Sequence, residues 1–420
     1  MSGRSTTLRA AAEVALGRQR APQHDSGPHM VPYLRAANVK DGVLDLTDVK
    51  EMNFTPTEQQ TFSLRPGDVL ITEGSGSLRA VGASAVWRGE IDGVVCFQNT
   101  LLRLRPRDDR ADGRFLEWWA RSAFGSGVFA SVASGANIYH ISAERVRALP
   151  IELPPLEEQR RIADFLDAET ARIDKLVRLR SEQSTLIGEG IAAEAVDLTG
   201  RSHIRRGGGT TENMVQLRRA AMSTQTGSTP ADLHELSDGS APEGNLPWYT
   251  PAAINSWMSI ATAEKATHRD GAPLFPAGSV VITGIGESLG KVAYLNHVAT
   301  GNQQLTAITP QVGVSGRFMA WQLWAAEQEI REWAQYSRIR IINNDSLKSF
   351  PIYLPSRAEQ DTVVRTLDSH MVRVRQITDA FLRFQRLADE RRQALITAAV
   401  TGQFDVSTAS GRNVPDGVSA

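Results

Sequence analysis

The chain carries two copies of several short sequence blocks, and this internal repeat constrains its fold more than any other feature. Segment 153–159, Leu-Pro-Pro-Leu-Glu-Glu-Gln, recurs as segment 354–360, Leu-Pro-Ser-Arg-Ala-Glu-Gln. Leu166-Asp167 recurs as Leu367-Asp368 at the same spacing. Self-similarity over such a distance indicates two copies of one folding unit. A chain of 420 residues is long enough for two domains with separate cores.

A long stretch without proline follows each copy of the repeated block. In the second stretch Leu367, Val374, Phe381, Ala388 and Leu395 recur at intervals of seven residues. This spacing is typical of the seam of a coiled coil. The first stretch has Leu166, Ile173 and Ile187 at the matching places, with polar residues between them, so its seam is weaker. Each helix would be roughly 60 Å long and would need a partner to cover its apolar side.

The sequence therefore predicts an α+β fold. We expect two β-rich mixed α/β domains, each followed by a long helix, with the two helices pairing as an antiparallel coiled coil. The alternative is that both helices are core helices of a bundle. The expected boundaries are a first domain at 1–155, a helix at 156–198, a flexible linker at 199–213, a second domain at 214–355, a helix at 356–403 and a C-terminal tail at 404–420.

Within the domains the same order of elements is expected twice. Segments 69–72 and 280–283 read as buried strands. Segment 99–105 alternates in polarity and predicts a half-exposed strand that ends at Pro106. Its counterpart, 305–309, ends at Pro310, and an aromatic helix follows each strand.

Composition leaves the class of partner open. The net charge is −1, whereas a strongly basic balance would point to nucleic acid. A basic face can, however, be balanced by acidic residues elsewhere on the surface. The single cysteine, Cys96, excludes an internal disulfide and fits a buried strand in a cytoplasmic protein. No apolar run reaches the roughly eighteen residues of a membrane span.

Known catalytic motifs do not fit this sequence. Segment 284–291 contains glycines and a lysine, as a phosphate-binding loop does. Ile285 and Val292, however, stand where that motif needs its first glycine and its hydroxyl residue. The eight histidines are scattered and have no metal-ligand spacing, so we expect no catalytic residue and no metal site.

Polar residues in the expected loops are the remaining candidates for a binding function. Arg and Asn can contact base edges, while Lys can hold phosphates. The candidate DNA-binding residues are Arg79, Asn137, Tyr139, His140, Lys291, Arg338, Arg340, Asn343 and Asn344.

Several blocks of the chain resemble the DNA-specificity (S) subunits of type I restriction-modification systems. The blocks are segments 17–20, 31–39, 137–142, 149–163 and 392–406, of which the Leu-Pro-Pro-Leu-Glu-Glu-Gln block is quite specific. The resemblance implies two target-recognition domains that each read half of a split DNA sequence, with the helices setting the gap between the halves.

The same resemblance implies the partners of the chain. It implies double-stranded DNA, two methyltransferase (M) subunits that methylate adenine, and restriction (R) subunits. S-adenosylmethionine, ATP and magnesium would bind to those subunits, and no cofactor is expected on this chain. The rival hypotheses are a coiled-coil scaffold or adaptor that binds proteins through its two domains, and a self-sufficient nuclease or methyltransferase.

Overall fold

A computed structural model describes residues 4–202, 213–336 and 340–406. The chain forms two compact units. The first unit consists of residues 1–179 and 382–420, and the second of residues 180–381. Each unit therefore contains one β-rich domain together with a segment of each long helix. The boundaries expected from the sequence, in contrast, treat the domains and the long helices as separate parts.

The first domain is built around a four-stranded antiparallel sheet. Its strand order is β2 (Ala12–Leu16), β11 (Leu101–Pro106), β7 (Val69–Thr72) and β9 (Ser84–Val86). A second sheet has the order β10 (Cys96–Phe97), β3 (Met30–Leu34) and β6 (Lys50–Asn53). Three short ladders pair β1 (Arg4–Thr7) with β13 (Pro150–Leu153), β4 (Val39–Lys40) with β5 (Val43–Leu44), and β8 (Gly74–Ser75) with β12 (Tyr139–His140). The helices are α1 (Leu8–Ala11), α2 (Pro56–Phe62), α3 (Gly113–Gly125), α4 (Val128–Val132) and α5 (Ala143–Ala148), with 3-10 turns at Pro22–His24 and Ala36–Asn38.

The second domain repeats this plan. Its central sheet has the order β15 (Ala221–Thr226), β22 (Leu305–Pro310), β19 (Val280–Thr283) and β20 (Val292–Tyr294). Its second sheet has the order β16 (His234–Glu235), β18 (Lys265–His268), β17 (Asn245–Tyr249) and β21 (Thr300–Gly301). Two short ladders pair β14 (Met214–Gln216) with β25 (Pro351–Tyr353), and β23 (Gln335–Tyr336) with β24 (Arg340–Ile341). The helices are α8 (Gly316–Ala325), α9 (Glu327–Trp333) and α10 (Asn344–Ser349), with 3-10 turns at Leu217–Arg219, Pro251–Ala253 and Ser256–Met258.

Each central sheet is covered on both faces, which corrects one expectation. Segment 99–105 was expected to be half-exposed, but Leu101 to Leu104 are buried. Leu102 and Leu104 pack toward α3, while Leu101 packs toward the second sheet. Arg103 is buried as well, because it donates to the carbonyl groups of Thr61 and Ser63 at 3.1 and 3.0 Å. The alternation of polarity along this strand thus reflects internal hydrogen bonding and not exposure to solvent.

The long helices are α6 (Leu156–Leu198) and α11 (Arg357–Val400). In the first unit the beginning of α6 lies beside the end of α11, and Arg392 forms an ion pair with Asp174. In the second unit the end of α6 lies beside the beginning of α11, where His370 Nδ1 is 2.7 Å from Glu194 Oε2. Both segments are therefore antiparallel pairs, as expected from the plan of one domain followed by one long helix in each half.

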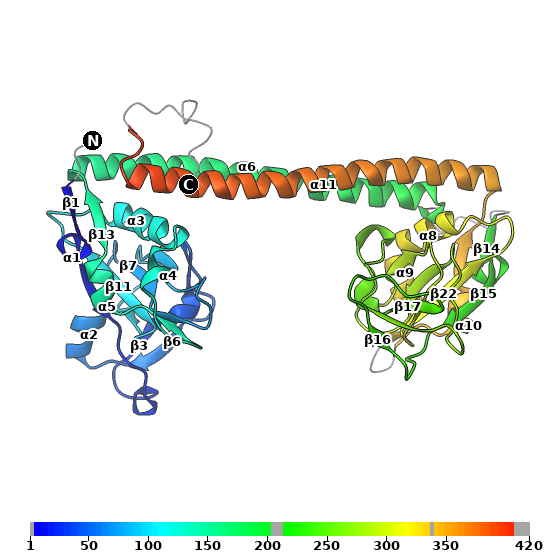
Figure 1. Ribbon diagram of the computed structural model, residues 1–420, viewed down its shortest axis with the longest axis horizontal. Coiled ribbons are helices and arrows are strands. Elements are labelled where there is room, and N and C mark those ends of the chain that lie inside the picture. The colour runs from blue at the N-terminus through cyan, green and yellow to red at the C-terminus, as the bar shows by residue number, and fades with distance from the viewer. Residues whose placement is uncertain (1–3, 203–212, 337–339, 407–420) are drawn as a thin grey trace. The chain divides into compact units, whose positions relative to one another are not determined.

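The residues of the predicted seam differ in how deeply they are buried. Those buried in the first unit are Leu166, Ile173, Ala388 and Leu395, and those buried in the second are Leu367 and Val374. Ile187 and Phe381 are only half-buried. In each unit a short helix of the domain, α3 or α8, lies between the central sheet and the long helices (Figure 1).

The start of the expected linker is an ordered part of the fold. Thr199 and Arg201 are fully buried, and Arg201 Nη1 donates to the carbonyl oxygen of Pro351 at 2.6 Å. Thr199 and Arg201 are thus packed into the second unit, where the buried guanidinium also forms an ion pair with Glu329. Residues 203–212 lie outside the described residues. The second long helix begins at Arg357 and ends at Val400, inside the expected range of 356–403.

The beginning of the C-terminal tail also packs on the first unit. The ring of Phe404 lies 5.5 Å from the ring of Phe165 on α6, and Val406 packs on the same core. The rest of the expected tail, 407–420, lies outside the described residues.

Candidate nucleic-acid interface

The first domain brings together a glycine loop and a later segment that were singled out separately in the sequence. β8 pairs with β12, so that Gly74 lies opposite His140 and Ser75 opposite Tyr139. Arg79 is exposed on the same glycine loop. Asn137 is exposed in the turn before β12. The four candidate residues of the first domain therefore belong to one pair of adjacent loops.

One of these candidates also has an internal partner. His140 Nδ1 lies 2.9 Å from Glu73 Oε2, and the His140 side chain is about half exposed. The contact orients the imidazole while leaving it open to solvent. Sequence reasoning missed Glu73 as part of this loop pair, because a glutamate at the end of a buried strand carries no signal for a partner so distant in sequence.

The second domain has the equivalent pair of loops. The amide of Gly286 donates to the carbonyl oxygen of Arg340 at 3.1 Å, and the amide of Ile342 donates to that of Gly284 at 3.0 Å. Lys291 and Arg340 are exposed. Arg338 lies outside the described residues. The structure therefore brings Lys291's loop and Arg340 into one region.

Two of the candidate asparagines have roles inside the fold. Asn343 is the N-cap of α10, and its side-chain oxygen accepts a hydrogen bond from the amide of Ser346 at 2.8 Å. Asn344 Nδ2 donates to Thr226 Oγ1 at 3.3 Å. An N-cap asparagine satisfies an amide that the helix leaves without a partner, which is a sufficient structural reason for this residue type. These amides are thus less available to a ligand than the sequence suggested.

The two glycine loops share a backbone frame but carry different side chains. Thr72 and Thr283 close their loops in the same way, since the amide of Thr72 donates to the Ala83 carbonyl and that of Thr283 to the Lys291 carbonyl. By this pattern Lys291 corresponds to Ala83 and not to Arg79. The hydroxyl of Thr72 donates to the carbonyl of Ala80, as that of Thr283 does to the carbonyl of Ser288. Arg79 therefore occupies the place that an acidic residue, Glu287, has in the second loop.

A polar cleft of about 520 Å³ lies beside the second sheet of the first domain. Its lining residues are Arg20, Asp25, Tyr33, Arg35, Lys50, Glu51 and Gln98. Arg20 pairs with Asp25 at 3.1 Å, and both Arg35 and Lys50 lie 2.6 Å from Asp48. The cleft thus presents paired cations that could exchange their carboxylate partners for the phosphates of a nucleic acid.

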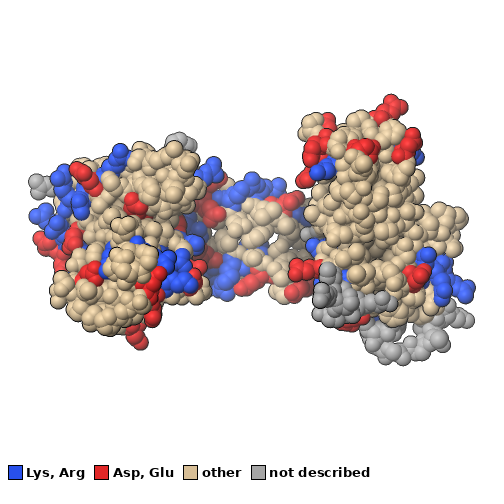
Figure 2. Space-filling model, turned by 90° about the horizontal axis from the view of Figure 1, so that it is seen from below, with Lys and Arg blue, Asp and Glu red and all other residues tan. Residues whose placement is uncertain are grey.

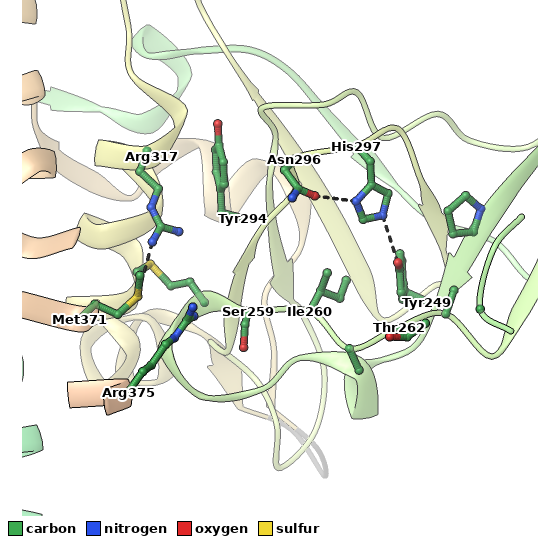
Figure 3. A pocket seen from close by; sticks show the side chains of 15 residues that line it. Tyr249, Ser259, Ile260, Thr262, Tyr294, Asn296, His297, Arg317, Met371 and Arg375 are labelled. Carbon is green, nitrogen blue, oxygen red and sulfur yellow. Dashed lines mark hydrogen bonds between the residues drawn. The ribbon is translucent and has the colours of Figure 1, made fainter. Parts of the chain in front are cut away.

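A second cleft of about 520 Å³ lies in the second unit, between α11 and the domain (Figure 3). Arg317, Met371 and Arg375 lie on one side of it, and Asn296, His297 and Tyr249 on the other. Tyr249 donates through its hydroxyl toward His297 Nε2 over 3.0 Å, or accepts from it, depending on the imidazole tautomer. Burial lowers the pKa of His297, so the neutral imidazole is favoured. The arginines are therefore the charged groups of this cleft.

Charges of both signs occur on the visible surface of the first unit. Figure 2 shows Lys and Arg side chains interspersed with Asp and Glu side chains there, while a large part of the second unit's visible face carries neither. Among the described residues no cluster of His, Cys, Asp or Glu could hold a metal ion. Burial raises the pKa of Cys96 to about 12, so its thiol is a core group and not a nucleophile. No helix in the described part of the chain has the length and apolarity of a membrane span.

The fold and the loops together define a protein with two related recognition domains, each attached to a pair of antiparallel helices. Residues 18–182 and 235–377 match the family described as the type I restriction modification DNA specificity domain. These segments make up more than half of the chain, and the chain belongs to this family.

Sequence similarity to a curated relative is partial. The chain is 31% identical over 155 residues to the type I restriction enzyme EcoKI specificity subunit of Escherichia coli strain K12. The match covers 36% of this chain and 32% of that protein, so it spans about a third of the relative's length.

Two solved structures share the fold over nearly the whole chain. One is a chain from a type I R-M system studied for its complex assembly and conformational transition. It has a TM-score of 0.75, is 20% identical, and is matched over 96% of this chain and 99% of that one. The other is the HsdS subunit from Thermoanaerobacter tengcongensis, with a TM-score of 0.56, 19% identity, and coverage of 96% and 97%. These likenesses extend the fold beyond the segments that the sequences share.

Proposed function

We propose that this chain is the DNA-specificity subunit of a type I restriction-modification complex and reads a bipartite DNA target. The observation that carries the proposal is the pair of equivalent loop regions on a shared backbone frame with unlike side chains. A protein that reads two different half-sites needs the same support twice and different contacts on each copy. Membership of the specificity-domain family supports the same reading.

The chain would act through partner subunits and have no catalytic residue of its own. We propose two methyltransferase subunits and restriction subunits as its protein partners, in the cytoplasm. S-adenosylmethionine, ATP and magnesium would bind to those partners. The mixed surface charge fits such a division, because partner subunits can supply much of the contact with the phosphate backbone. A scaffold that binds only proteins is not favoured, since it gives no reason for the paired loop regions.

The proposal is tested by methylation in the source strain. Adenine methylation is mapped across the genome with the gene present, deleted and restored. A split adenine motif should disappear on deletion and return on restoration. An unchanged methylation pattern in a strain whose methyltransferase subunits are present would count against the proposal.

The division of labour between the domains is tested by an exchange of residues 214–355 for the same domain of a relative. This exchange should change only one half of the motif. The purified chain alone should transfer no methyl group from S-adenosylmethionine and cut no DNA with magnesium, which separates a specificity subunit from a self-sufficient enzyme.

A further inference from the structure

An aspartate on the long helix that follows each domain holds two side chains of that domain. In the first unit Trp118 Nε1 donates to Asp167 Oδ1 at 2.9 Å, and Arg114 Nη1 donates to Asp167 Oδ2 at 3.0 Å. Arg114 and Trp118 are four residues apart on α3, so both lie on the face of that helix that meets α6. Both oxygens of one carboxylate therefore bind the domain.

The second unit has the same contact. Trp321 Nε1 donates to Asp368 Oδ1 at 2.8 Å, and Arg317 Nε donates to the same carboxylate at 3.0 and 3.2 Å. Asp167 and Asp368 are the aspartates of the repeated Leu-Asp block. Their partners form a further repeat, Gly-Arg-Phe-x-x-Trp, at 113–118 and 316–321.

A glutamine supplies a second anchor in each unit. Gln159 Oε1 accepts from the amide of Asp112 at 2.9 Å, at the start of α3, and Gln360 Oε1 accepts from the amide of Ser315 at 2.8 Å, at the start of α8. Both glutamines are buried. Each lies eight residues before its aspartate, about 12 Å along the helix axis. Two anchors at this separation prevent the domain from pivoting about either one.

The contacts to the other long helix are not repeated. In the first unit Ser122 Oγ donates to Thr397 Oγ1 at 3.3 Å, and the backbone of Gly125 approaches the side chain of Gln393 closely. In the second unit Gln322 Nε2 donates to the carbonyl oxygen of Thr199 at 3.0 Å. Among the hydrogen bonds of the described residues, the attachment to the domain's own following helix is thus the one that both copies share.

We propose that these two sets of residues are domain clamps that position each recognition domain on its helix and thereby restrict the gap between the half-sites that the protein accepts. The first clamp is Arg114, Trp118, Gln159 and Asp167, and the second is Arg317, Trp321, Gln360 and Asp368. The inference rests on the proposed function for its effect on DNA, but the positioning itself can be measured without DNA. The indole N–H groups make it testable, because both tryptophans are buried and a buried donor needs its acceptor.

The first experiment measures positioning in the full chain. Spin labels are attached through Ser77→Cys in the first domain and Lys175→Cys on α6, both exposed positions. The native Cys96 is buried and stays unlabelled. The distance distribution by pulsed electron resonance should be narrow in the parent and broader in Trp118→Phe, which keeps a ring but removes the donor. Trp248→Phe is the control for the loss of an indole donor in general, because its hydrogen bond to Ser228 lies in the second domain and touches neither long helix.

The second experiment measures the gap in the complex with the methyltransferase subunits. Methyl transfer is compared on duplexes that contain both half-sites with gaps from two base pairs shorter to two longer than the natural one. Discrimination against the neighbouring gaps should fall about tenfold in Trp118→Phe and in Trp321→Phe, which corresponds to about 1.4 kcal/mol. Discrimination between bases within each half-site should stay at the parent's level, as should every readout of Trp248→Phe.

The outcomes of the two experiments distinguish failure of the domain-clamp proposal from failure of the proposed DNA-specificity function. Unchanged distance distributions and an unchanged gap preference would overturn the proposal, and so would a parallel loss of gap and base discrimination, which indicates damage to the domain itself. Asp167→Asn and Asp368→Asn serve as second variants if the phenylalanine variants fold poorly. They keep an acceptor for the indole and should show the same effects to a smaller degree. A broadened distance in a chain that selects no split site would support the clamp while counting against the proposed DNA function.

Discussion

Glu117 on α3 is a carboxylate in the interior of the first unit, 3% exposed, with Arg88 Nη2 at 3.1 Å from its Oε2. Burial raises the pKa of Glu117, and Arg88 opposes the rise without cancelling it. A carboxyl group with a raised pKa in the folded state holds its proton longer than in the unfolded state. Its contribution to stability is therefore complete below the unfolded pKa and is lost as pH rises through the folded pKa.

Glu117→Gln should remove this pH dependence because the amide does not ionise. The free energy of unfolding of the variant minus that of the parent should increase as pH rises from 4 to 7, because only the parent loses stability over this range. Urea unfolding at both pH values measures the change. Arg88→Gln should make the loss of stability with rising pH larger than in the parent, since the positive charge that stabilises the ionised Glu117 is gone. A relative stability of Glu117→Gln that is constant or falls with pH would contradict the prediction.

The choice of Arg, Lys and Asn residues in the expected loops identified the region of the candidate site, but it did not identify the role of each side chain. Asn137 and Asn343 are equally plausible base readers in the sequence and both are exposed, yet the side-chain oxygen of Asn343 is engaged as the N-cap of α10. The difference depends on where a helix begins, to within one residue. Asp167 shows the converse case. It was recognised as part of a repeat, but nothing in a Leu-Asp pair predicts that a tryptophan forty-nine positions earlier binds it.

The long helices were the elements that the sequence predicted best. The expected first helix has the same bounds as α6, because a Leu-Pro pair marks its start and no proline interrupts the stretch that follows. The seven-residue spacing also predicted that the two helices pair. It could not predict that the domains share in covering the seam. Leu367 and Met371 pack with Trp321 and other residues of the second domain, so a helix seam here is part of a domain core.

Shortening a buried side chain of the helix seam should therefore lower the free energy of unfolding as much as shortening a side chain in the core of a domain. Leu367 is fully buried, and Leu367→Ala should lower the free energy of unfolding by about 2–5 kcal/mol, through lost burial and the cavity left behind. Leu387→Ala on the same helix, at 63% exposure, should change it by less than about 0.5 kcal/mol. Chemical denaturation of both variants measures the two effects. Equal losses would show that burial along α11 does not follow the structure.

At the scale of the whole molecule, the two copies of the repeat share a backbone frame and differ in their loops. The sheets and the helix entrances recur in both halves. The helix entrances and the central strands at 69–72 and 280–283 could be predicted, because Leu-Pro pairs and buried runs of β-branched residues are local patterns, whereas the order of the strands in the sheets could not. The loop regions could not, because Arg79 and Lys291 take different places on the same frame, a difference that only the hydrogen bonds of Thr72 and Thr283 reveal. If the two domains read different half-sites of the DNA from the same backbone frame, their sequences should differ most in these loops.

The proposed role of the helices as a spacer gives the last prediction. Seven residues inserted into α6 after Leu179 and into α11 after Phe381 keep the apolar seam in phase, since seven residues are two turns of a coiled coil. They lengthen each helix by about 10 Å, which equals about three base pairs of duplex DNA. The preferred gap between the half-sites should lengthen by up to that amount while both half-site sequences stay unchanged. Methylome sequencing of a strain with the lengthened gene measures both. The matched control lengthens α11 alone, which puts the two seams out of register and should abolish methylation. A lengthened protein that still methylates the original gap would show that the helices do not set the spacing.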